Sequence, residues 1–288
     1  MKRILITGAN SYIGTSFENY IKQWPEEYQV DTIDMIDGSW REKSFVGYDA
    51  IFHVAGIAHM KETRKNAPLY YMVNCDLAVE TACKSKADGV KQFVFLSSMS
   101  VYGMETGVIT RETQPSPKTH YGKSKLEAEK GISALVDENY SVAILRPPMV
   151  YGKGCKGNFQ LLIRIAEKAP VFPCYANQRS MIYIDNLSSF VKMTIDNAMN
   201  DILYPQNREY VRTDYILKLI AECMDRKVSL SKLLMPAVAV ANKFIVQSRK
   251  AFGSLIYRDV PNFDHCFIVC EFPDSIRRSI CAHESTMH

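Results

Sequence analysis

The chain has 288 residues, an ordinary globular composition and no repeated or low-complexity segment. This length allows one large domain or two, with a sizeable buried core. The net charge of +4 is too small to indicate nucleic-acid binding, although it modestly favours an anionic substrate.

The first residues predict a βα unit with a glycine turn. The apolar run 3–7 is typical of a buried strand, and a helix is expected from about Thr15 to Gln23. Between them lies Gly8-Ala-Asn-Ser11-Tyr-Ile-Gly14, with Ser11 where a dinucleotide fingerprint has its middle glycine. Gly8 permits the tight turn, and Gly14 lets the helix direct its first amides at a pyrophosphate. A purely structural turn is the alternative.

The second strand, 30–33, ends in an acidic residue. Asp34 lies about 20 residues beyond the last glycine, where a carboxylate that binds the ribose of NAD is expected. No arginine follows it at once, which favours NAD over NADP. Asp31 and Asp37 are rivals, and Asp37 could equally be a turn residue. The stretch 34–51 is too short for a helix and another strand, so one βα unit is expected to be abbreviated.

Two further strands end in residues suited to a ligand site. The run 49–56 ends in small residues, which let a ligand approach the backbone. His53 within it is expected to be a packed strand residue, whereas His59, just beyond, remains a candidate. The next strand leads from Lys91 into Ser97 and Ser98, which fall where open α/β sheets bind ligands.

Tyr121 and Lys125 are four residues apart, so on a helix they share one face. A lysine cation there is expected to lower the tyrosine pKa from its usual value of about 10, which would make the phenol an acid/base near neutrality. An exposed pair at a helix start is the alternative, because short motifs of this kind recur by chance.

Together these patterns resemble the extended short-chain dehydrogenases/reductases, and within them the NAD-dependent sugar-nucleotide epimerases and dehydratases, which include UDP-galactose 4-epimerases. The resemblance is clear over residues 1–190. It is carried by six local patterns: Thr7-Gly-Ala-Asn10, Ser97-Ser-Met-Ser-Val-Tyr-Gly103, Tyr121-x3-Lys125, Leu145-Arg-Pro147, Val150-Tyr-Gly152 and Arg179-Ser-Met-Ile-Tyr-Ile-Asp185.

The resemblance implies a role for each matching residue. Ser98 would bond the reacting sugar hydroxyl, Tyr121 would move its proton, and Lys125 would hold the nicotinamide ribose. Asn158 and Arg179 would contact the nucleotide diphosphate; arginine suits phosphate, although a surface charge is the alternative. Asn74 would sit near the cofactor, or else cap a helix. The expected NAD-binding residues are Gly8, Ser11, Tyr12, Ile13, Gly14, Asp34, Asp37, Val54, Ala55, Gly56, Asn74, Tyr121, Lys125 and Pro148.

The residues after Ser98 argue against one branch of this family. Dehydratases resemble Thr-Asp-Glu here, whereas this chain has Ser98, Met99 and Ser100. Elimination of water needs an acid and a base beyond the tyrosine, and Met99 and Ser100 can supply neither. The favoured function is therefore an NAD-dependent UDP-sugar 4-epimerase. A 4-keto-sugar reductase or dehydrogenase and a non-catalytic dinucleotide-binding regulator remain as alternatives.

The expected fold is α/β, a Rossmann-type doubly wound parallel sheet with a smaller, mixed C-terminal substrate lobe. Residues 1–150 form the NAD-binding domain and 151–288 mainly the lobe, with about 180–197 returning to the first domain. Helices are expected at 158–168 and 213–224, a short strand and a helix within 183–197, and a strand at 267–270. The helices near 76–86 and 121–136 resemble the pair with which the family often forms homodimers.

The remaining features concern location and metal. The chain runs straight into its first strand, so no signal peptide is expected, and scattered cysteines favour a cytoplasmic protein. The apolar stretch 230–246, with basic residues to 250, could be an interfacial membrane segment, a buried helix or an oligomer contact. A C-terminal group is too irregularly spaced to predict a metal site. Its members are His265, Cys266, Cys270, Cys281 and His283.

Overall fold

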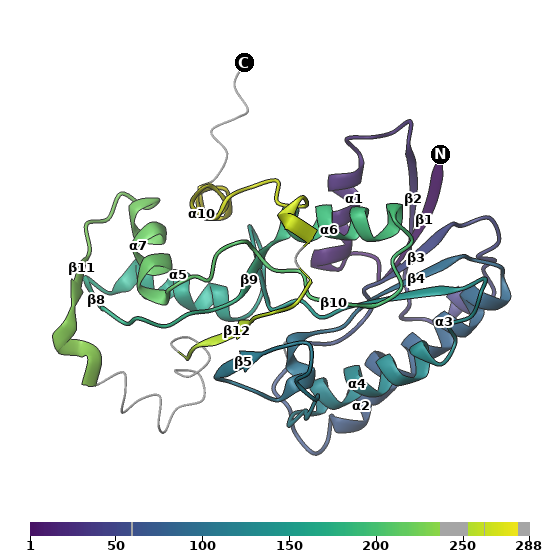
Figure 1. Cartoon of the computed structure of the whole chain (residues 1–288), viewed down its shortest axis with the longest axis horizontal. Coiled ribbons are helices and arrows are strands. Elements are labelled where there is room, and N and C mark those ends of the chain that lie inside the picture. Colours follow the sequence, from purple (N-terminus) through teal and green to yellow (C-terminus); the bar gives the residue numbers. More distant parts are fainter. Residues whose placement is uncertain (59, 237–252, 262, 282–288) are drawn as a thin grey trace.

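The computed structural model describes residues 1–58, 60–236, 253–261 and 263–281. A parallel six-stranded sheet with helices on both faces forms its centre, as the sequence predicts (Figure 1). The strands lie in the order β10-β6-β4-β3-β1-β2. Their bounds are β1 Lys2–Thr7, β2 Tyr28–Ile33, β3 Ala50–His53, β4 Gln92–Leu96, β6 Ser141–Leu145 and β10 Ile202–Leu203.

The central strands are apolar on both sides because both faces of the sheet are covered. In β1, Ile4 and Ile6 point into the core beneath α1 (Tyr12–Ile21) and α6 (Ile184–Asp196). Leu5 points into the opposite core, beneath α3 (Leu77–Ala87) and α4 (His120–Ser133). Figure 1 shows α2 (Ala67–Tyr71) beside α3 and α4 on this second face.

The connection between β2 and β3 is abbreviated, as expected from its length. It contains one 3-10 turn, Ser39–Arg41, and no α-helix. The chain passes from β2 to β3 across β1, which lies between them in the sheet. Because the next strand, β4, continues on the far side of β3, the chain reverses direction around β1. Ligands of open α/β sheets bind beyond the strand ends at such a reversal.

A second group of short elements lies to one side of the sheet, at the left of Figure 1. Its strands form the parallel pairs β8–β11, β5–β12 and β7–β9. The bounds are β5 Gly107–Ile109, β7 Met149–Tyr151, β8 Val171–Pro173, β9 Met181–Tyr183, β11 Ser229–Ser231, β12 Leu255–Tyr257, α5 Asn158–Lys168, α7 Thr213–Glu222 and α10 Phe272–Ile280. The helix predicted at 158–168 is confirmed, and the one predicted at 213–224 ends two residues earlier.

One predicted strand is absent, and the predicted apolar stretch is described only in part. Residues 267–270 are not a strand but an irregular segment leading into α10, in which Phe267 and Cys270 are buried. These residues are apolar because Phe267 and Cys270 pack into the hydrophobic core, and not because the segment pairs in a sheet. The apolar stretch 230–246 is described only as far as Pro236, and it begins with β11 and a 3-10 turn, Lys232–Leu234.

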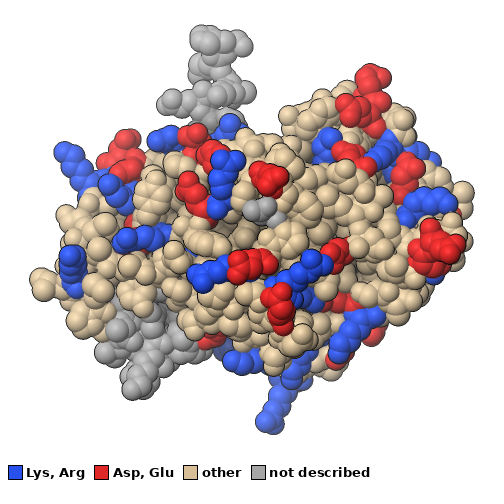
Figure 2. Space-filling model, in the orientation of Figure 1, with Lys and Arg blue, Asp and Glu red and all other residues tan. Residues whose placement is uncertain are grey.

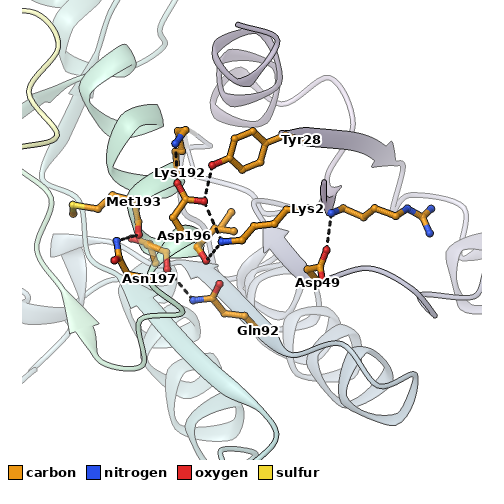
Figure 3. Close-up of polar contacts among 11 residues, drawn as sticks. Lys2, Tyr28, Asp49, Gln92, Lys192, Met193, Asp196 and Asn197 are labelled. Carbon is orange, nitrogen blue, oxygen red and sulfur yellow. Dashed lines mark hydrogen bonds and ion pairs between the residues drawn. The ribbon is translucent and has the colours of Figure 1, made fainter. Parts of the chain in front are cut away.

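The amino ends of the strands carry a polar cluster that fixes α6 to the sheet (Figure 3). The Asp196 carboxylate accepts hydrogen bonds from Lys2 Nζ at 3.1 Å and from the Tyr28 hydroxyl at 2.6 Å. Lys192, one turn earlier on α6, lies 2.8 Å from the other carboxylate oxygen. Gln92 of β4 donates to the carbonyl of Thr194. This cluster lies at the opposite end of the strands from the candidate site.

Surface charge is mixed on the face shown in Figure 2. Lysine and arginine side chains are interspersed there with aspartate and glutamate, and no broad stretch of one sign crosses the part of this face that the structure describes. The eight cysteines are free thiols, and no three His, Cys, Asp or Glu side chains among the described residues could share a metal ion. In the described part of the chain, no helix is long and apolar enough to cross a bilayer.

Candidate active site

The turn after β1 packs closely against the backbone just beyond β3. Gly8 has a φ of +98°, and a Cβ on it would lie 2.8 Å from the backbone nitrogen of Ala55. Ser11 begins α1, and its hydroxyl accepts a hydrogen bond of 3.2 Å from the N–H of Gly14. The Ser11 side chain therefore caps α1 and does not point outward. Among the described residues, the N–H groups of Tyr12 and Ile13 have no hydrogen-bond partner, so they can receive an anion.

The three acidic residues in and just after β2 differ in their hydrogen-bond partners. Asp34 is exposed at the strand end and accepts one hydrogen bond, from the N–H of Ile36 at 2.9 Å. Asp37 accepts from both the N–H and the hydroxyl of Ser39, and the hydroxyl bond lowers the pKa of Asp37. Asp31 bonds Tyr48 instead. Asp34 is therefore best placed to receive ribose hydroxyls, and the turn interpretation of Asp37 is the better one.

Lys125 is buried beside the ends of β3 and β4. Its Nζ donates to the Leu96 carbonyl at 2.7 Å and lies 4.6 Å from the centre of the Phe95 ring. A Cβ on Gly56 would lie 2.9 Å from Oδ1 of Asn74 and 3.5 Å from this Nζ, so the glycine lets the backbone after β3 pack against Asn74 beside the ammonium group. Burial lowers the pKa of Lys125 to about 8, and the charge of Glu129 opposes that change.

Asn74 fixes the backbone that follows β3. It lies in a π-helical turn, Met72–Asp76, and its amide accepts from the N–H of Ile57 at 2.8 Å and donates to the carbonyl of Ile57 at 3.0 Å. Its Nδ2 also donates to the Ser124 hydroxyl on α4. The alternative that Asn74 caps a helix is wrong, because it lies inside a continuous helical segment.

Ser98 and Tyr121 face each other across the carboxyl end of β4. Ser98 precedes the 3-10 turn Met99–Tyr102, and its hydroxyl accepts from the N–H of Ser100 at 3.1 Å. The N–H of Met99 donates to the carbonyl of Pro147, which places the Pro147–Pro148 segment beside this turn. Tyr121 is half-buried in the first turn of α4, after its cap residue Thr119.

The expected effect of Lys125 on Tyr121 is wrong in this structure. Burial raises the pKa of Tyr121, and the group that opposes this is the hydrogen-bonding side chain of Ser98. The lysine ammonium is drawn to the Leu96 carbonyl and the Phe95 ring. Residue spacing placed both side chains on one helix face, but it could not say toward which group each one turns.

A buried polar network behind the site has no counterpart in the sequence predictions. Arg146 and Glu129 form an ion pair with two hydrogen bonds, and they are only 4 % and 3 % exposed. The Ser97 hydroxyl donates to the same carboxylate, and Arg146 Nη1 donates to the Tyr102 hydroxyl at 2.7 Å. Two features of the sequence point to these residues: Glu129 lies one turn beyond Lys125, and Arg146 belongs to a family pattern. Neither feature predicts that the two residues pair with each other.

His53 is a packed strand residue, as predicted, rather than a catalytic one. Its Nδ1 lies 2.8 Å from the Thr7 hydroxyl, and its ring stacks on Phe93. Burial and then the positive charge of Lys125 lower the pKa of His53 to about 3. The other histidine candidate, His59, lies outside the described residues.

The buried His53 should make folding sensitive to acid. An unfolded histidine gains its proton near pH 6.5, whereas His53 in the folded state does so only near pH 3. The unfolded state therefore binds more protons between these values, and stability present above pH 6.5 is lost as the pH falls. We expect the free energy of unfolding to drop by up to about 1.4 kcal/mol per pH unit from this residue. Urea unfolding between pH 7 and 4 should show a shallower loss for His53→Gln; equal slopes would contradict the assignment.

The predicted diphosphate contacts lie in the second group of elements. Arg179 is buried, its Nη1 donates to the Gly253 carbonyl at 2.7 Å, and its Nε has no partner. Among the described residues no carboxylate lies within ion-pair distance of it, and burial lowers the pKa of Arg179 to about 10. A buried cation of this kind favours an anionic partner. Asn158 is exposed at the start of α5, and no contact joins it to Arg179.

The arrangement fits a dinucleotide. Three features form a cradle at the carboxyl ends of β1 and β2: the tight turn at Gly8, the unpartnered first amides of α1, which suit a pyrophosphate, and the carboxylate of Asp34, which suits a ribose. The hydroxyls of Ser98 and Tyr121 lie at the same edge of the sheet, beyond the carboxyl end of β4.

Comparison with known proteins agrees with this geometry. A model of the NAD dependent epimerase/dehydratase family matches residues 4–203. A UDP-glucose 4-epimerase from Vibrio cholerae is 31 % identical over 251 residues, which cover 78 % of this chain and 76 % of the relative. An N-acetyl-α-D-glucosaminyl-diphospho-ditrans,octacis-undecaprenol 4-epimerase from Escherichia coli O157:H7 is 28 % identical over 68 % of this chain, and the match spans 63 % of that protein.

Solved structures resemble the whole described fold. A UDP-glucuronic acid 4-epimerase from Bacillus cereus, in complex with NAD, has a TM-score of 0.72 at 18 % identity, covering 96 % of this chain and 95 % of that one. A dTDP-4-dehydrorhamnose reductase from Bacillus anthracis, in complex with NADP, has a TM-score of 0.73 at 20 % identity, covering 97 % and 98 %. At these identities the likeness concerns the fold alone.

Proposed function

The chain belongs to the NAD-dependent epimerase/dehydratase family, and on this premise we propose that it is a UDP-sugar 4-epimerase. The observation that carries the proposal is the pair of hydroxyls, Ser98 and Tyr121, with Lys125 one turn further along α4 and its ammonium group buried at the end of β4. A protein that only bound the dinucleotide would not need an acid/base tyrosine there. The similarity to the Vibrio cholerae UDP-glucose 4-epimerase supports the choice of reaction.

The residues that would hold NAD follow from the cradle described above. The first amides of α1 would bind the pyrophosphate, Asp34 the adenosine ribose, and Lys125 the nicotinamide ribose. One hydrogen of the Lys125 ammonium group is used by the Leu96 carbonyl, and its other two suit ribose hydroxyls. NAD supplies a hydride acceptor that can return the hydride, so the reaction consumes no cofactor overall.

Tyr121 would move the proton of the sugar 4-hydroxyl. The hydroxyl of Ser98 bonds the same oxygen and favours the phenolate form of Tyr121, against the burial that raises its pKa. Loss of this proton from the oxygen, together with loss of a hydride from C4 to the bound NAD, would give a 4-keto sugar whose C4 is planar. Once that sugar presents its other face, Tyr121 returns the proton to the oxygen. Arg179 and Asn158 would contact the nucleotide. The buried guanidinium of Arg179, which has no ion-pair partner among the described residues, would bind the diphosphate.

Met99 and Ser100 continue to argue against dehydration. They form the 3-10 turn after Ser98, and neither side chain is a carboxyl acid or base. The homodimer, the cytoplasmic location and a membrane contact near residues 230–250 remain predictions.

The proposal predicts interconversion of a UDP-sugar pair without net change in NAD. The purified protein should be incubated with UDP-glucose, UDP-galactose and their N-acetyl forms, and the products separated by chromatography. Conversion that requires stoichiometric NADH or NADPH would instead indicate a 4-keto-sugar reductase. No conversion of any pair would contradict the epimerase proposal.

A further inference from the structure

A carboxylate outside the predicted site binds the first turn of the helix that carries Tyr121. Glu62 lies between β3 and α2, and its two oxygens accept hydrogen bonds from the N–H of His120 at 2.9 Å and the N–H of Tyr121 at 3.0 Å. The next N–H, that of Gly122, donates to the Thr119 hydroxyl at 3.1 Å. All three of these amides are therefore bonded to side chains, and one carboxylate takes two of them.

The segment that presents Glu62 is itself braced. Asn66 accepts from the N–H of Thr63 at 2.8 Å and donates to the carbonyl of Lys61 at 3.0 Å. The Tyr70 hydroxyl of α2 donates to the carbonyl of Met60 at 2.9 Å. These bonds lie on both sides of Glu62 in the chain, so the carboxylate is held at a fixed place rather than on a free loop.

The same segment begins at the cofactor cradle. It leaves β3 through Gly56, next to Lys125, and Asn74 bonds both polar backbone groups of Ile57. Glu62 thus joins the strand end that would carry the cofactor to the helix that carries the proton-transfer residue. An acidic side chain at a helix N-terminus is electrostatically favourable, and charge-assisted bonds to N–H groups are stronger than neutral ones.

We propose that Glu62 is a positioning residue for Tyr121, because its carboxylate fixes the first turn of α4 so that the tyrosine hydroxyl stays opposite Ser98. The inference rests on the proposed proton-transfer role of Tyr121. A displacement of about 1 Å in such a group can cost on the order of 100-fold in rate. Glu62 itself touches neither of the reacting hydroxyls.

Two substitutions test the proposal by graded loss of the bonds. Glu62→Gln keeps the shape but offers one acceptor oxygen to two N–H groups, and Glu62→Ala offers none. We expect kcat to fall about 10-fold in the first and about 100-fold in the second, with the KM for the sugar nucleotide and the NAD content of the purified protein unchanged. Glu138→Gln, at an exposed turn beyond α4, is the matched control and should leave kcat unchanged.

Amide hydrogen exchange supplies a readout that does not depend on turnover. In Glu62→Ala, exchange at His120 and Tyr121 should accelerate, while the later turns of α4 keep their protection. Unchanged exchange there, or unchanged kcat in Glu62→Ala, would overturn the proposal, as would a loss of NAD binding with a general drop in Tm. If the wild-type protein converted no sugar nucleotide, the proposed function would fail, and exchange at Tyr121 would still decide whether Glu62 holds the turn.

Discussion

Replacing Tyr121 by phenylalanine is expected to lower kcat by a factor of about 10²–10⁴, the usual contribution of a positioned acid/base. The ring and its packing in the first turn of α4 are kept, and only the hydroxyl that faces Ser98 is removed. The hydroxyl of Tyr121 is the phenol that the structure brings to hydrogen-bonding distance of Ser98 among the described residues. Binding of NAD and of the sugar nucleotide should be nearly unchanged, because the lost hydroxyl acts in the proton-transfer step.

The measurement is the rate of interconversion of the active UDP-sugar pair, with the NAD content of each preparation determined after denaturation. Tyr20→Phe is a suitable control, because Tyr20 lies at the end of α1 against Trp24, away from the carboxyl ends of the strands. Full activity in Tyr121→Phe would remove the tyrosine from the mechanism. Loss of activity together with loss of NAD would point instead to a role in holding the cofactor.

Replacing Arg146 by methionine should destabilise the fold by about 3–5 kcal/mol, the range for a buried ion pair that loses one partner. Glu129 would remain buried without its ion-pair partner, still bonded to Ser97 and with the longer-range charge of Lys125 as its remaining cation. Burial alone would lower the pKa of Arg146, but the hydrogen bond and charge of Glu129 outweigh it and raise that pKa. Urea unfolding at pH 7 would measure the loss.

Two controls separate the buried charge from a general packing effect. Arg111→Met breaks an exposed pair with Asp201, whose side chains are 58 % and 50 % exposed, and should cost about 1 kcal/mol or less. The double variant Glu129→Gln/Arg146→Met removes both charges and should recover about 2 kcal/mol or more of the loss. A cost for Arg146→Met no larger than that for Arg111→Met would contradict the prediction.

Local patterns were sufficient for the sheet and its ligand-binding turn. Strand β1 and helix α1 follow from an apolar run, a glycine with positive φ and a capping serine, all within the first 21 residues. The abbreviated β2–β3 connection follows from chain length, because 16 residues between two strands leave no room for both a helix and a strand. The strand predicted at 267–270 was wrong, because this apolar run is buried by packing and not by strand pairing.

The sequence by itself determined the fold class and the family, and it predicted Ser98, Tyr121 and Lys125 as the candidate catalytic residues, because these depend on periodicity and on short spacings along the chain. Only the tertiary structure showed that burial raises the pKa of Tyr121 and that the side chain of Ser98 opposes this rise. It also decided that Glu62 lies at the start of α4 and that Glu129 pairs with Arg146. Those contacts join residues from different elements, 59 and 17 positions apart. The direction in which a buried charge turns is set by the partners that packing brings to it, and these cannot be read from its neighbours in the chain.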